Sequence, residues 1–585
     1  MLYNFRMDNY ELAETFDRIA DLMEIKGEVV YKFLAYRRAA ENLRSLAESA
    51  QAMREQNRLQ EIPGVGKAIA EKITELLDTG KLEFLERLEQ EVPPTLRDLL
   101  QVPDLGPKKA ALFWKQAGIT TLGELEAAAQ GGQLRGLPGM GEKSETRILE
   151  GIQAVKRRST RMLLSTARGV ANRWLAWLRE QPGVERAEAA GSLRRWKATI
   201  GDIDLVAACT RPAEVMAAFA AAPGILRVVG QGENKCSVEL PDGIRMQLWL
   251  QPPERFGSLL QFVSGSKDHN VRLRELAQRK GLSLSERGFI EESTGREILC
   301  AREEEVYATL GLPYIVPELR EDRGEIQAAQ AGRLPRLIEI ADITADLHSH
   351  SDWSDGANTI LQMAEAARAQ GRKALAITDH TGSLGIANGL TVERLRAQRK
   401  AIDEAQAVLG DSIRLLQGAE VEIHADGGLD YPDEVLAELD IVIASLHVSL
   451  RQPREVITPR LLGVMRNPHV DIIGHLSGRL LPNREGADLD MDIVLSAARE
   501  TGVALEINAN PTRLDLDEVY ARRAGEMGIL MSINTDAHDK TWFEQAEYGV
   551  SVARRAWLSP ENIITAWSPE KLLGWLAERN ERAKK

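Results

Sequence analysis

Cysteine is rare in this 585-residue sequence, and long apolar runs are missing from it. The three cysteines, Cys209, Cys236 and Cys300, show no CxxC or CxxH spacing, which argues against a disulfide framework and against a thiolate zinc site. No run approaches the ~20 apolar residues of a membrane span, and residues 1–10 lack the layout of a signal peptide. We therefore expect a protein of the reducing cytoplasm with no membrane partner.

Positive charge is also in deficit, because 74 lysines and arginines stand against 87 acidic residues and give a net charge of −13. This total argues weakly against nucleic acid as a partner. Between Lys156 and Lys197, however, 11 basic residues accompany only three acids. Such a local basic surface can bind phosphates on an acidic protein, and the alternative interpretation is a solvated helix face.

The length suggests about four domains. Residues 1–155 carry apolar residues at helical spacing with short Gly/Pro breaks, whereas the pattern from about 185 to 250 is typical of strands. After about residue 341, short apolar strands alternate with helical stretches, which indicates βα units around a parallel sheet or barrel. We therefore predict a multidomain protein that combines α+β and α/β parts behind a helical N-terminal region.

A near-repeat occurs three times in the helical region, as "IPGVGKAIAEKI" (62–73), "VPDLGPKKAALF" (102–113) and "LPGMGEKSETRI" (137–148). In each copy an apolar residue, a proline and a tight turn ending in glycine precede a helix. Such a turn points free backbone N–H groups at an anion. This is the helix–hairpin–helix pattern, which binds the DNA backbone without reading bases. The predicted DNA-binding residues are Gly64, Gly66, Gly106, Gly139 and Gly141.

Histidine is scarce, with nine residues in all, yet six of them lie at or just beyond the ends of predicted strands in the C-terminal part. In a barrel of parallel strands these ends converge on one face. A single histidine in such a place is more often structural, but six indicate a metal site. Imidazole and carboxylate without thiolate suit Zn, Mn or Fe. The predicted ligands are His348, His350, Asp355, His380, Glu420, His447, His475, Asp536 and His538.

The motifs "DLHSHSDWSDG", "ITDH", "GAEVEI", "ASLH", "GHLSGR" and "NTDAH" together resemble the PHP (polymerase and histidinol phosphatase) domain over about residues 341–575. The resemblance implies a distorted (β/α)7 barrel with up to three Mn or Zn ions. One ion would bind His348, His350, Glu420 and Asp536. A second would share Glu420 with His447 and His475, and a third would bind Asp355, His380 and His538. Arg479 is a candidate phosphate clamp, with a surface arginine as the alternative interpretation.

A second constellation, "AGSLRRWKATIGDIDLV" (190–206), places Asp202 and Asp204 on one face of a predicted strand. Two carboxylates aimed together repel each other unless cations lie between them. The spacing resembles the nucleotidyltransferase palm of family X DNA polymerases. The likeness implies Mg or Mn on these two aspartates and deoxynucleoside triphosphates as substrate. The nucleotide-binding residues that it implies are Gly191, Ser192, Arg195 and Gly265.

One residue departs from that family's pattern. Where a third aspartate is expected, the strand "DGIRMQLWL" carries Gln247, which should still face Asp202 and Asp204. A neutral amide cannot take the proton of a primer 3′-hydroxyl, and it weakens a two-metal site. We therefore expect polymerisation that is feeble, manganese-dependent or absent.

The likeness to family X extends to "YKFLAYRRAAENL" at the N-terminus and to "GSLLQFVSGSKDHNVRLRELA" after the palm. It implies that Lys72 is a Schiff-base lysine that removes 5′-deoxyribose phosphate, with an exposed helix lysine as the alternative. The expected domains are a small lyase-like domain at 1–85, helical fingers at 86–155, the palm at 156–255, the thumb at 256–320, a linker at 321–340 and the PHP domain at 341–585.

Together the resemblances imply a DNA-repair family X polymerase of the bacterial type with a PHP-domain 3′–5′ exonuclease. We expect it to act as a monomer on gapped, nicked or primer–template DNA. The alternative is a DNA gap- or end-binding protein whose palm is a vestige and whose only chemistry is phosphoester hydrolysis. A small-molecule phosphatase is a third possibility, but this function does not explain the three helix–hairpin–helix motifs.

Overall fold

The computed structural model describes residues 9–44, 50–62, 64–102, 105–159, 161–241, 243–383 and 387–583. One compact unit is built mainly from residues 1–160 and a second mainly from residues 161–585. Within the described ranges, no helix combines the length and the apolar character that a membrane crossing needs.

The first unit is helical, as the sequence predicts, and its helices pack around one apolar core that includes Phe16, Ile73 and Phe113. Gly64 and Gly139 adopt φ values of +76° and +74° in their hairpin turns. This left-handed conformation favours glycine. The helices are α1 (Asn9–Lys26), α2 (Val30–Arg44), α3 (Ala50–Glu55), α4 (Lys67–Thr79), α5 (Glu83–Glu91), α6 (Leu96–Leu99), α7 (Pro107–Ala117), α8 (Leu122–Gln130) and α9 (Glu142–Ser159).

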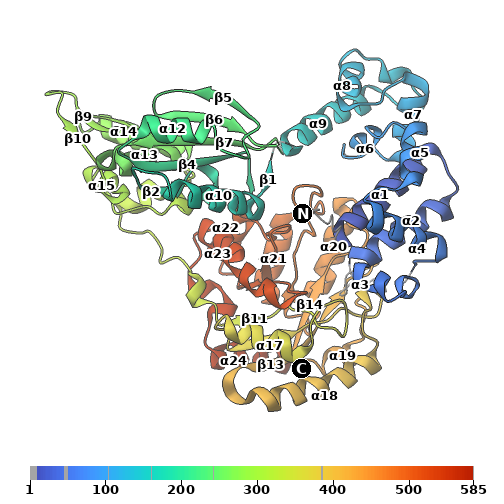
Figure 1. Cartoon of the computed structure of the whole chain (residues 1–585). Coiled ribbons are helices and arrows are strands. Elements are labelled where there is room, and N and C mark those ends of the chain that lie inside the picture. Colours follow the sequence, from blue (N-terminus) through green and yellow to red (C-terminus); the bar gives the residue numbers. More distant parts are fainter. Residues whose placement is uncertain are drawn as a thin grey trace. The chain divides into compact units, whose positions relative to one another are not determined.

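The second unit begins with a five-stranded sheet in the order β2-β4-β7-β6-β5, drawn in green in Figure 1. Only β4 and β7 are parallel neighbours. Leu205 and Ala207 face the core formed with helices α10 and α12, while Val206 and Ala208 pack on α13 at the opposite face. The strands are β2 (Val184–Ala189), β4 (Asp202–Cys209), β5 (Arg227–Gln231), β6 (Lys235–Glu239) and β7 (Arg245–Gln251), and the helices are α10 (Leu164–Arg179), α11 (Gly191–Arg194), α12 (Pro212–Ala220) and α13 (Phe256–Ser264).

A small α+β segment follows, with a three-stranded antiparallel sheet. The stretch expected to be a linker is partly ordered within it. His269 Nδ1 lies 2.6 Å from Glu325 Oε1, and Ile326 and Leu337 join the same apolar core as Leu273. The elements are α14 (Lys267–Gln278), β8 (Leu282–Ser285), β9 (Gly288–Glu291), β10 (Glu297–Ile298), α15 (Glu303–Thr309) and α16 (Glu325–Gln330).

The C-terminal part is a seven-stranded parallel sheet whose strands follow one another in chain order. A bridge between Ser349 and Ala537 brings its two edges together, so the sheet is a nearly closed barrel, as predicted. Helices such as α18 and α24 lie outside it (Figure 1). The strands are β11 (Ala345–Asp346), β12 (Ala374–Ile377), β13 (Arg414–Glu422), β14 (Ile441–Ser445), β15 (Ile472–Ile473), β16 (Ala504–Asn508) and β17 (Met531–Asn534), and the longer helices are α17 (Ile360–Ala369), α18 (Val392–Leu409), α20 (Arg454–Met465), α21 (Met491–Thr501), α22 (Glu518–Glu526), α23 (Ala546–Arg555) and α24 (Pro569–Ala583).

Within the second unit, the five-stranded part and the barrel meet through charged side chains. Arg555 of α23 is almost fully buried and donates hydrogen bonds to Glu321 Oε1 at 3.0 Å and to Glu518 Oε1 at 2.9 Å. Arg195 donates to the same Glu321 oxygen at 3.0 Å, and its backbone oxygen accepts from Arg555 at 2.6 Å. One carboxylate therefore joins an arginine of each part.

Candidate functional site

The ends of the barrel strands bring all nine predicted ligands together. His348, His447 and His475 each lie two residues beyond a strand, and Glu420 lies inside β13. Their ligand atoms fall into three groups, and within each group the atoms lie within 4.8 Å of one another. The groups are His348, His350, Glu420 and Asp536; then Glu420, His447 and His475; and then His350, Asp355, His380 and His538. These are the sets that the resemblance to the PHP domain implies, with His350 added to the third.

Glu420 is the centre of the two inner groups. One of its oxygens lies 2.8 Å from His475 Nε2 and 3.4 Å from His447 Nε2, and the other lies 3.3 Å from His348 Nε2. His348 Nε2 is also 3.5 Å from Asp536 Oδ1. His475 is close enough to form a hydrogen bond with Glu420, while the other pairs of ligand atoms are 3.3 to 3.5 Å apart. Atoms gathered in this way could hold an ion.

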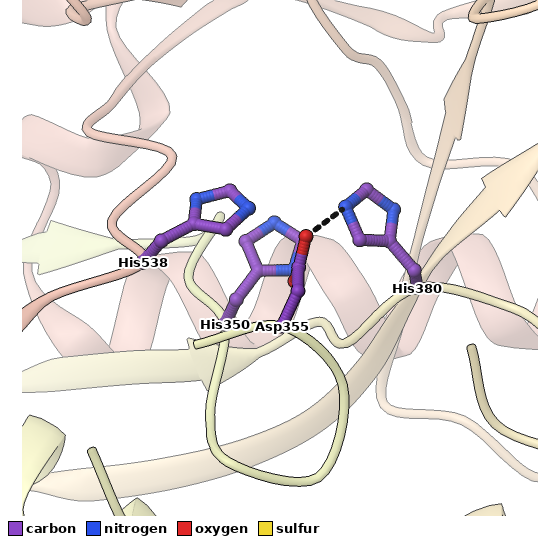
Figure 2. Close-up of side chains that lie close together, drawn as sticks. All are labelled: His350, Asp355, His380 and His538. Carbon is purple, nitrogen blue, oxygen red and sulfur yellow. Dashed lines mark ion pairs between the residues drawn. The ribbon is translucent and has the colours of Figure 1, made fainter. Parts of the chain in front are cut away.

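The third group, drawn in Figure 2, has two partly exposed members, Asp355 and His538. Asp355 lies between two imidazoles, 3.5 Å from His380 Nε2 and 3.7 Å from His350 Nδ1. His538 closes the group from the end of β17 and keeps 25% of its side-chain surface exposed. Solvent and a substrate can therefore reach the site from this side.

Two glutamates that the sequence analysis missed orient the histidines. Glu506 of β16 lies 2.7 Å from His348 Nδ1, and Glu422 of β13 lies 2.7 Å from His447 Nδ1. Each carboxylate fixes the proton on Nδ1, so Nε2 presents its lone pair to the cluster. The available signal was an acidic residue inside an otherwise buried strand, in "ALEIN" and "AEVEI".

The same carboxylates make the cluster attractive to positive charge. Burial opposes protonation of His348, yet the surrounding carboxylates, led by Glu506, raise its pKa well above the usual value. At His447 burial is likewise outweighed by Glu420 and Glu422, which raise the pKa to about 9. Burial and the guanidinium of Arg513 lower the pKa of His475. The donor set of imidazole and carboxylate without thiolate fits Zn or Mn.

Arg479, the candidate phosphate clamp, has another role. Its Nε donates a hydrogen bond of 2.8 Å to the backbone oxygen of Arg513, and its Nη2 donates to the backbone oxygen of Leu514. The guanidinium therefore supports the loop after β16. Its side chain is 17% exposed, and a role as a phosphate clamp stays a prediction. His424 and His469 do not belong to any of the three groups, as expected.

A second site lies on the five-stranded sheet. Gln247 pairs with Asp204 in the register of β4 and β7, and its Nε2 donates a hydrogen bond of 2.7 Å to Asp202 Oδ2. Burial first, and then the charge of Asp202, raise the pKa of Asp204 to about 7. Gly191 is required at its position because a Cβ there would overlap the Asp204 carboxylate. The two aspartates and Gln247 therefore face one another as predicted.

Two of the residues expected to bind a nucleotide lie near these carboxylates, because Gly191 adjoins Asp204 and the charge of Arg195 acts on the same carboxyl group. Arg195 Nη1 donates to the backbone oxygen of Ser264, next to Gly265, whose φ is +66°. Ser192 and Gly191 begin the short helix α11. Arg194 is used differently, because its two terminal nitrogens each lie 2.8 Å from the buried carboxylate of Glu303.

In the helical unit, the first hairpin lies beside a cleft. Its volume is about 820 Å³, and Gly64, Gly66, Lys32 and Phe84 line it. Lys72 Nζ is 5.0 Å from the Phe84 ring and donates to the backbone oxygen of Ala68 at 3.3 Å. Its role as a lyase nucleophile stays a prediction.

The remaining hairpin glycines open helices. Gly66 and Gly106 are the N-cap residues of α4 and α7, and Gly141 directly precedes α9. Residue 63 of the first hairpin and residues 103–104 of the second lie outside the described residues. Backbone contact with DNA through these turns also stays a prediction.

Family models match four parts of the chain. They are a helix-hairpin-helix domain at residues 7–82, a SAM-like helix-hairpin-helix tandem at 96–154, a DNA polymerase beta thumb at 259–321 and a PHP domain at 346–510. The DNA polymerase/3′-5′ exonuclease PolX of Bacillus subtilis is 39% identical over 577 residues, covering 98% of this chain and 100% of the relative. The chain belongs to the bacterial PolX family.

Other relatives resemble parts of this PolX chain. A probable phosphatase of Thermoanaerobacter is 30% identical over 252 residues, which cover 41% of this chain and 97% of the phosphatase. DNA polymerase lambda of the rat is 25% identical over 341 residues, which cover 54% of this chain and 56% of the polymerase. The resemblances to family X and to the PHP domain are thereby confirmed.

Proposed function

We propose that this PolX chain is a DNA-repair enzyme that joins weak, template-directed gap filling to 3′–5′ hydrolysis in the barrel. The observation that carries the hydrolytic half is the set of three overlapping donor groups around Glu420. The name of the Bacillus relative, a polymerase and 3′-5′ exonuclease, supports both halves. The proposed substrate is gapped, nicked or primer–template DNA. A cytoplasmic location and a monomeric state remain our expectations.

In the barrel, nine side chains would hold up to three Mn or Zn ions. When bound, divalent ions generate hydroxide near neutral pH and clamp the attacking and leaving oxygens of a phosphoester. The side chains of the protein itself would orient the metal ligands. Glu506 and Glu422 keep the imidazoles of His348 and His447 in the tautomer that offers Nε2. Burial of Glu420 keeps bulk water away from the inner groups.

In the palm, Asp202 and Asp204 would hold Mg or Mn, while Gly191, Ser192, Arg195 and Gly265 would bind a deoxynucleoside triphosphate. A guanidinium such as that of Arg195 suits phosphate oxygens. Gln247 brings no charge to this site and cannot accept the proton of the primer 3′-hydroxyl. We therefore propose that nucleotide binding is retained and that nucleotidyl transfer is slow.

In the helical unit, the hairpin turns at Gly64, Gly66, Gly106, Gly139 and Gly141 would bind the DNA backbone through free N–H groups. The cleft beside the first hairpin is large enough for a nucleotide end, and Lys72 lies near Phe84 at its edge. This arrangement supports the lyase role without requiring it.

A second candidate function is a DNA gap- or end-binding protein with a vestigial palm and hydrolysis as its only chemistry. The observation that favours it is the hydrogen bond from Gln247 to Asp202, because it occupies a carboxylate oxygen that a metal ion would need. The intact pair of aspartates favours the first candidate.

One assay separates the candidates. Purified chain is incubated with a labelled gapped duplex and Mn²⁺ or Mg²⁺, with and without nucleotides. Weak lengthening together with shortening supports the first function, and shortening with retention but no lengthening supports the second. The variant with both His348→Ala and His350→Ala should lose shortening and keep DNA retention. Shortening that survives in this variant would contradict the barrel assignment.

A further inference from the structure

An arginine that is largely buried, Arg513, lies beside the cluster of predicted metal ligands. Arg513 lies in the turn that follows β16, and its Nε is 3.6 Å from Asp536 Oδ2. Only 15% of its side chain is exposed. Its Nη1 atom is buried and has no hydrogen-bond partner among the residues that the structure describes. A buried cationic donor left without a partner is costly, so the site favours an acceptor that arrives from outside.

The backbone around Arg513 is held from several directions. Its amide donates to the backbone oxygen of Asn510 at 2.8 Å, and its oxygen accepts from Arg479 Nε at 2.8 Å. The oxygen of Thr512 accepts from the amide of Leu481 at 2.6 Å. The turn is thus fixed, while the guanidinium at its tip is directed to the cluster. Such prior ordering lowers the cost of binding a ligand.

The net positive charge that the cluster would have with its metal ions bound also favours the binding of an anion. Three divalent ions would bring more positive charge than the carboxylates of the three groups and the supporting Glu422 and Glu506 can neutralise. Arg513 adds one more positive charge within 3.6 Å of Asp536. The positive charge of Arg513 by itself disfavours the binding of metal ions to the cluster. The same charge becomes favourable once a phosphate, with its negative oxygens, lies between the metal ions and the guanidinium.

We propose that Arg513 binds the non-bridging oxygens of the scissile phosphate in the barrel. The inference rests on the proposed hydrolysis. In that reaction a water oxygen bonds to phosphorus and the P–O3′ bond breaks. The 3′-oxygen takes up a proton, and a nucleoside 5′-monophosphate leaves. The planar guanidinium offers two parallel N–H donors to phosphate oxygens, in which negative charge grows as the bond forms. Arg479 does not contact the phosphate in this proposal; it supports the turn that carries Arg513 through its hydrogen bond to the Arg513 backbone oxygen.

The first test measures binding rather than turnover. Full-length chain loaded with Mn²⁺ is titrated with inorganic phosphate in a calorimeter. Arg513→Ala should weaken phosphate binding by at least about tenfold, and Arg513→Lys should weaken it less. The affinity of the metal-free chain for Mn²⁺ should be equal or higher in Arg513→Ala, because a repelling charge has been removed. The matched control is Arg454→Ala, which removes an exposed arginine paired with Asp488 and should change neither quantity.

The second test is hydrolysis of a 3′-labelled strand. Arg513→Ala should lower kcat/KM by about 10²–10³-fold while the bound Mn²⁺ is unchanged. Unaltered phosphate affinity, or loss of activity that only follows loss of Mn²⁺, would overturn the role of Arg513. If the wild-type chain binds phosphate through Arg513 but hydrolyses no DNA, the proposed function fails and the phosphate site stands. The two failures are therefore distinguishable.

Discussion

Gln247 Nε2 donates a hydrogen bond of 2.7 Å to Asp202 Oδ2, at the position where the family X pattern has a third aspartate. The amide thus satisfies one carboxylate oxygen in the metal-free palm. The repulsion between the two carboxylates remains, because the charge of Asp202 still raises the pKa of Asp204.

Gln247→Asp is expected to increase primer extension. The new carboxylate removes the amide donor, adds a metal ligand and restores an acceptor for the 3′-hydroxyl proton. Extension on a gapped duplex with Mg²⁺ should rise by about tenfold or more. Gln247→Asn, which keeps a neutral amide, should show no gain. Equal rates for Gln247→Asp and wild type, or fast extension by the wild type, would contradict our account of this residue.

Removal of a supporting carboxylate should loosen the barrel ions. Glu422→Gln leaves the ring of His447 in place but no longer fixes its tautomer, so Mn²⁺ affinity should fall by about 10–100-fold. Glu506→Gln should have a similar effect through His348. Metal analysis and calorimetry on the full chain measure this. The control Glu404→Gln alters an exposed glutamate that is 4.0 Å from Lys400. A loss of equal size in that control would rule out a specific positioning role.

Metal binding in the palm should depend on pH because the pKa of Asp204 is about 7. This value is higher than the 3.8 of an ordinary aspartate, so the metal-free folded form keeps a proton that the unfolded form has lost. The stability contributed by this proton is lost as pH rises through 7. A cation must displace the proton, so Mn²⁺ affinity should rise about tenfold per pH unit below 7 and level off above it.

Adding Glu420→Ala to the His348→Ala, His350→Ala variant isolates this palm signal, because the three substitutions together remove a ligand from each of the three barrel groups. Mn²⁺ titrations between pH 6 and 8 then report on Asp202 and Asp204. An affinity that stays flat across this range would show that Asp204 is already ionised at pH 6.

Lys72→Ala should abolish covalent trapping. Full-length chain is mixed with DNA that carries a 5′-deoxyribose phosphate, and borohydride reduces any Schiff base. We expect trapping to drop by about tenfold or more in Lys72→Ala. Lys81→Ala, in the exposed turn after α4, serves as the control. Undiminished trapping in the Lys72 variant would remove the lyase role.

Arg555→Ala should destabilise the contact between palm and barrel. It leaves the carboxylates of Glu321 and Glu518 without their buried partner, which costs about 3–5 kcal/mol. The thermal midpoint should drop by several degrees. Arg396→Ala breaks an exposed pair with Glu438 and should cost less than about 1 kcal/mol. Equal midpoints for the two variants would mean that the buried network contributes little.

The strand ends were predictable from sequence because parallel strands bring their carboxyl ends to one face. Histidines and acids at these ends in "DLHSH", "ASLH" and "NTDAH" therefore had to meet. The supporting pairs were not predictable, because 158 residues separate His348 from Glu506 and no local pattern connects them. The contacts of two arginines in the barrel could not be predicted from the sequence either. Arg479 and Arg513 both follow barrel strands, and only the fold decides which guanidinium faces the cluster of predicted ligands.

The palm was predictable to a similar degree. The alternation in "GDIDL" and "IRMQLWL" places Asp202, Asp204 and Gln247 close together on two neighbouring strands, with Asp204 paired to Gln247. The different uses of Arg194 and Arg195 depend on Glu303 and Glu321, which lie far along the chain. Segment 321–340 was predicted to be a linker because it carries charge, glycine and proline without a clear strand pattern, whereas in the structure Glu325 contacts His269 of α14.

The carboxylate of Glu321 accepts from Arg195 of the palm and from Arg555 of the barrel. A fragment that ends near residue 320 leaves Arg195 without Glu321, and one that begins near residue 341 leaves Arg555 with Glu518 but without Glu321. Each fragment therefore loses a charge pair that the intact chain has, and the part that it contains is expected to be less stable than in the intact chain.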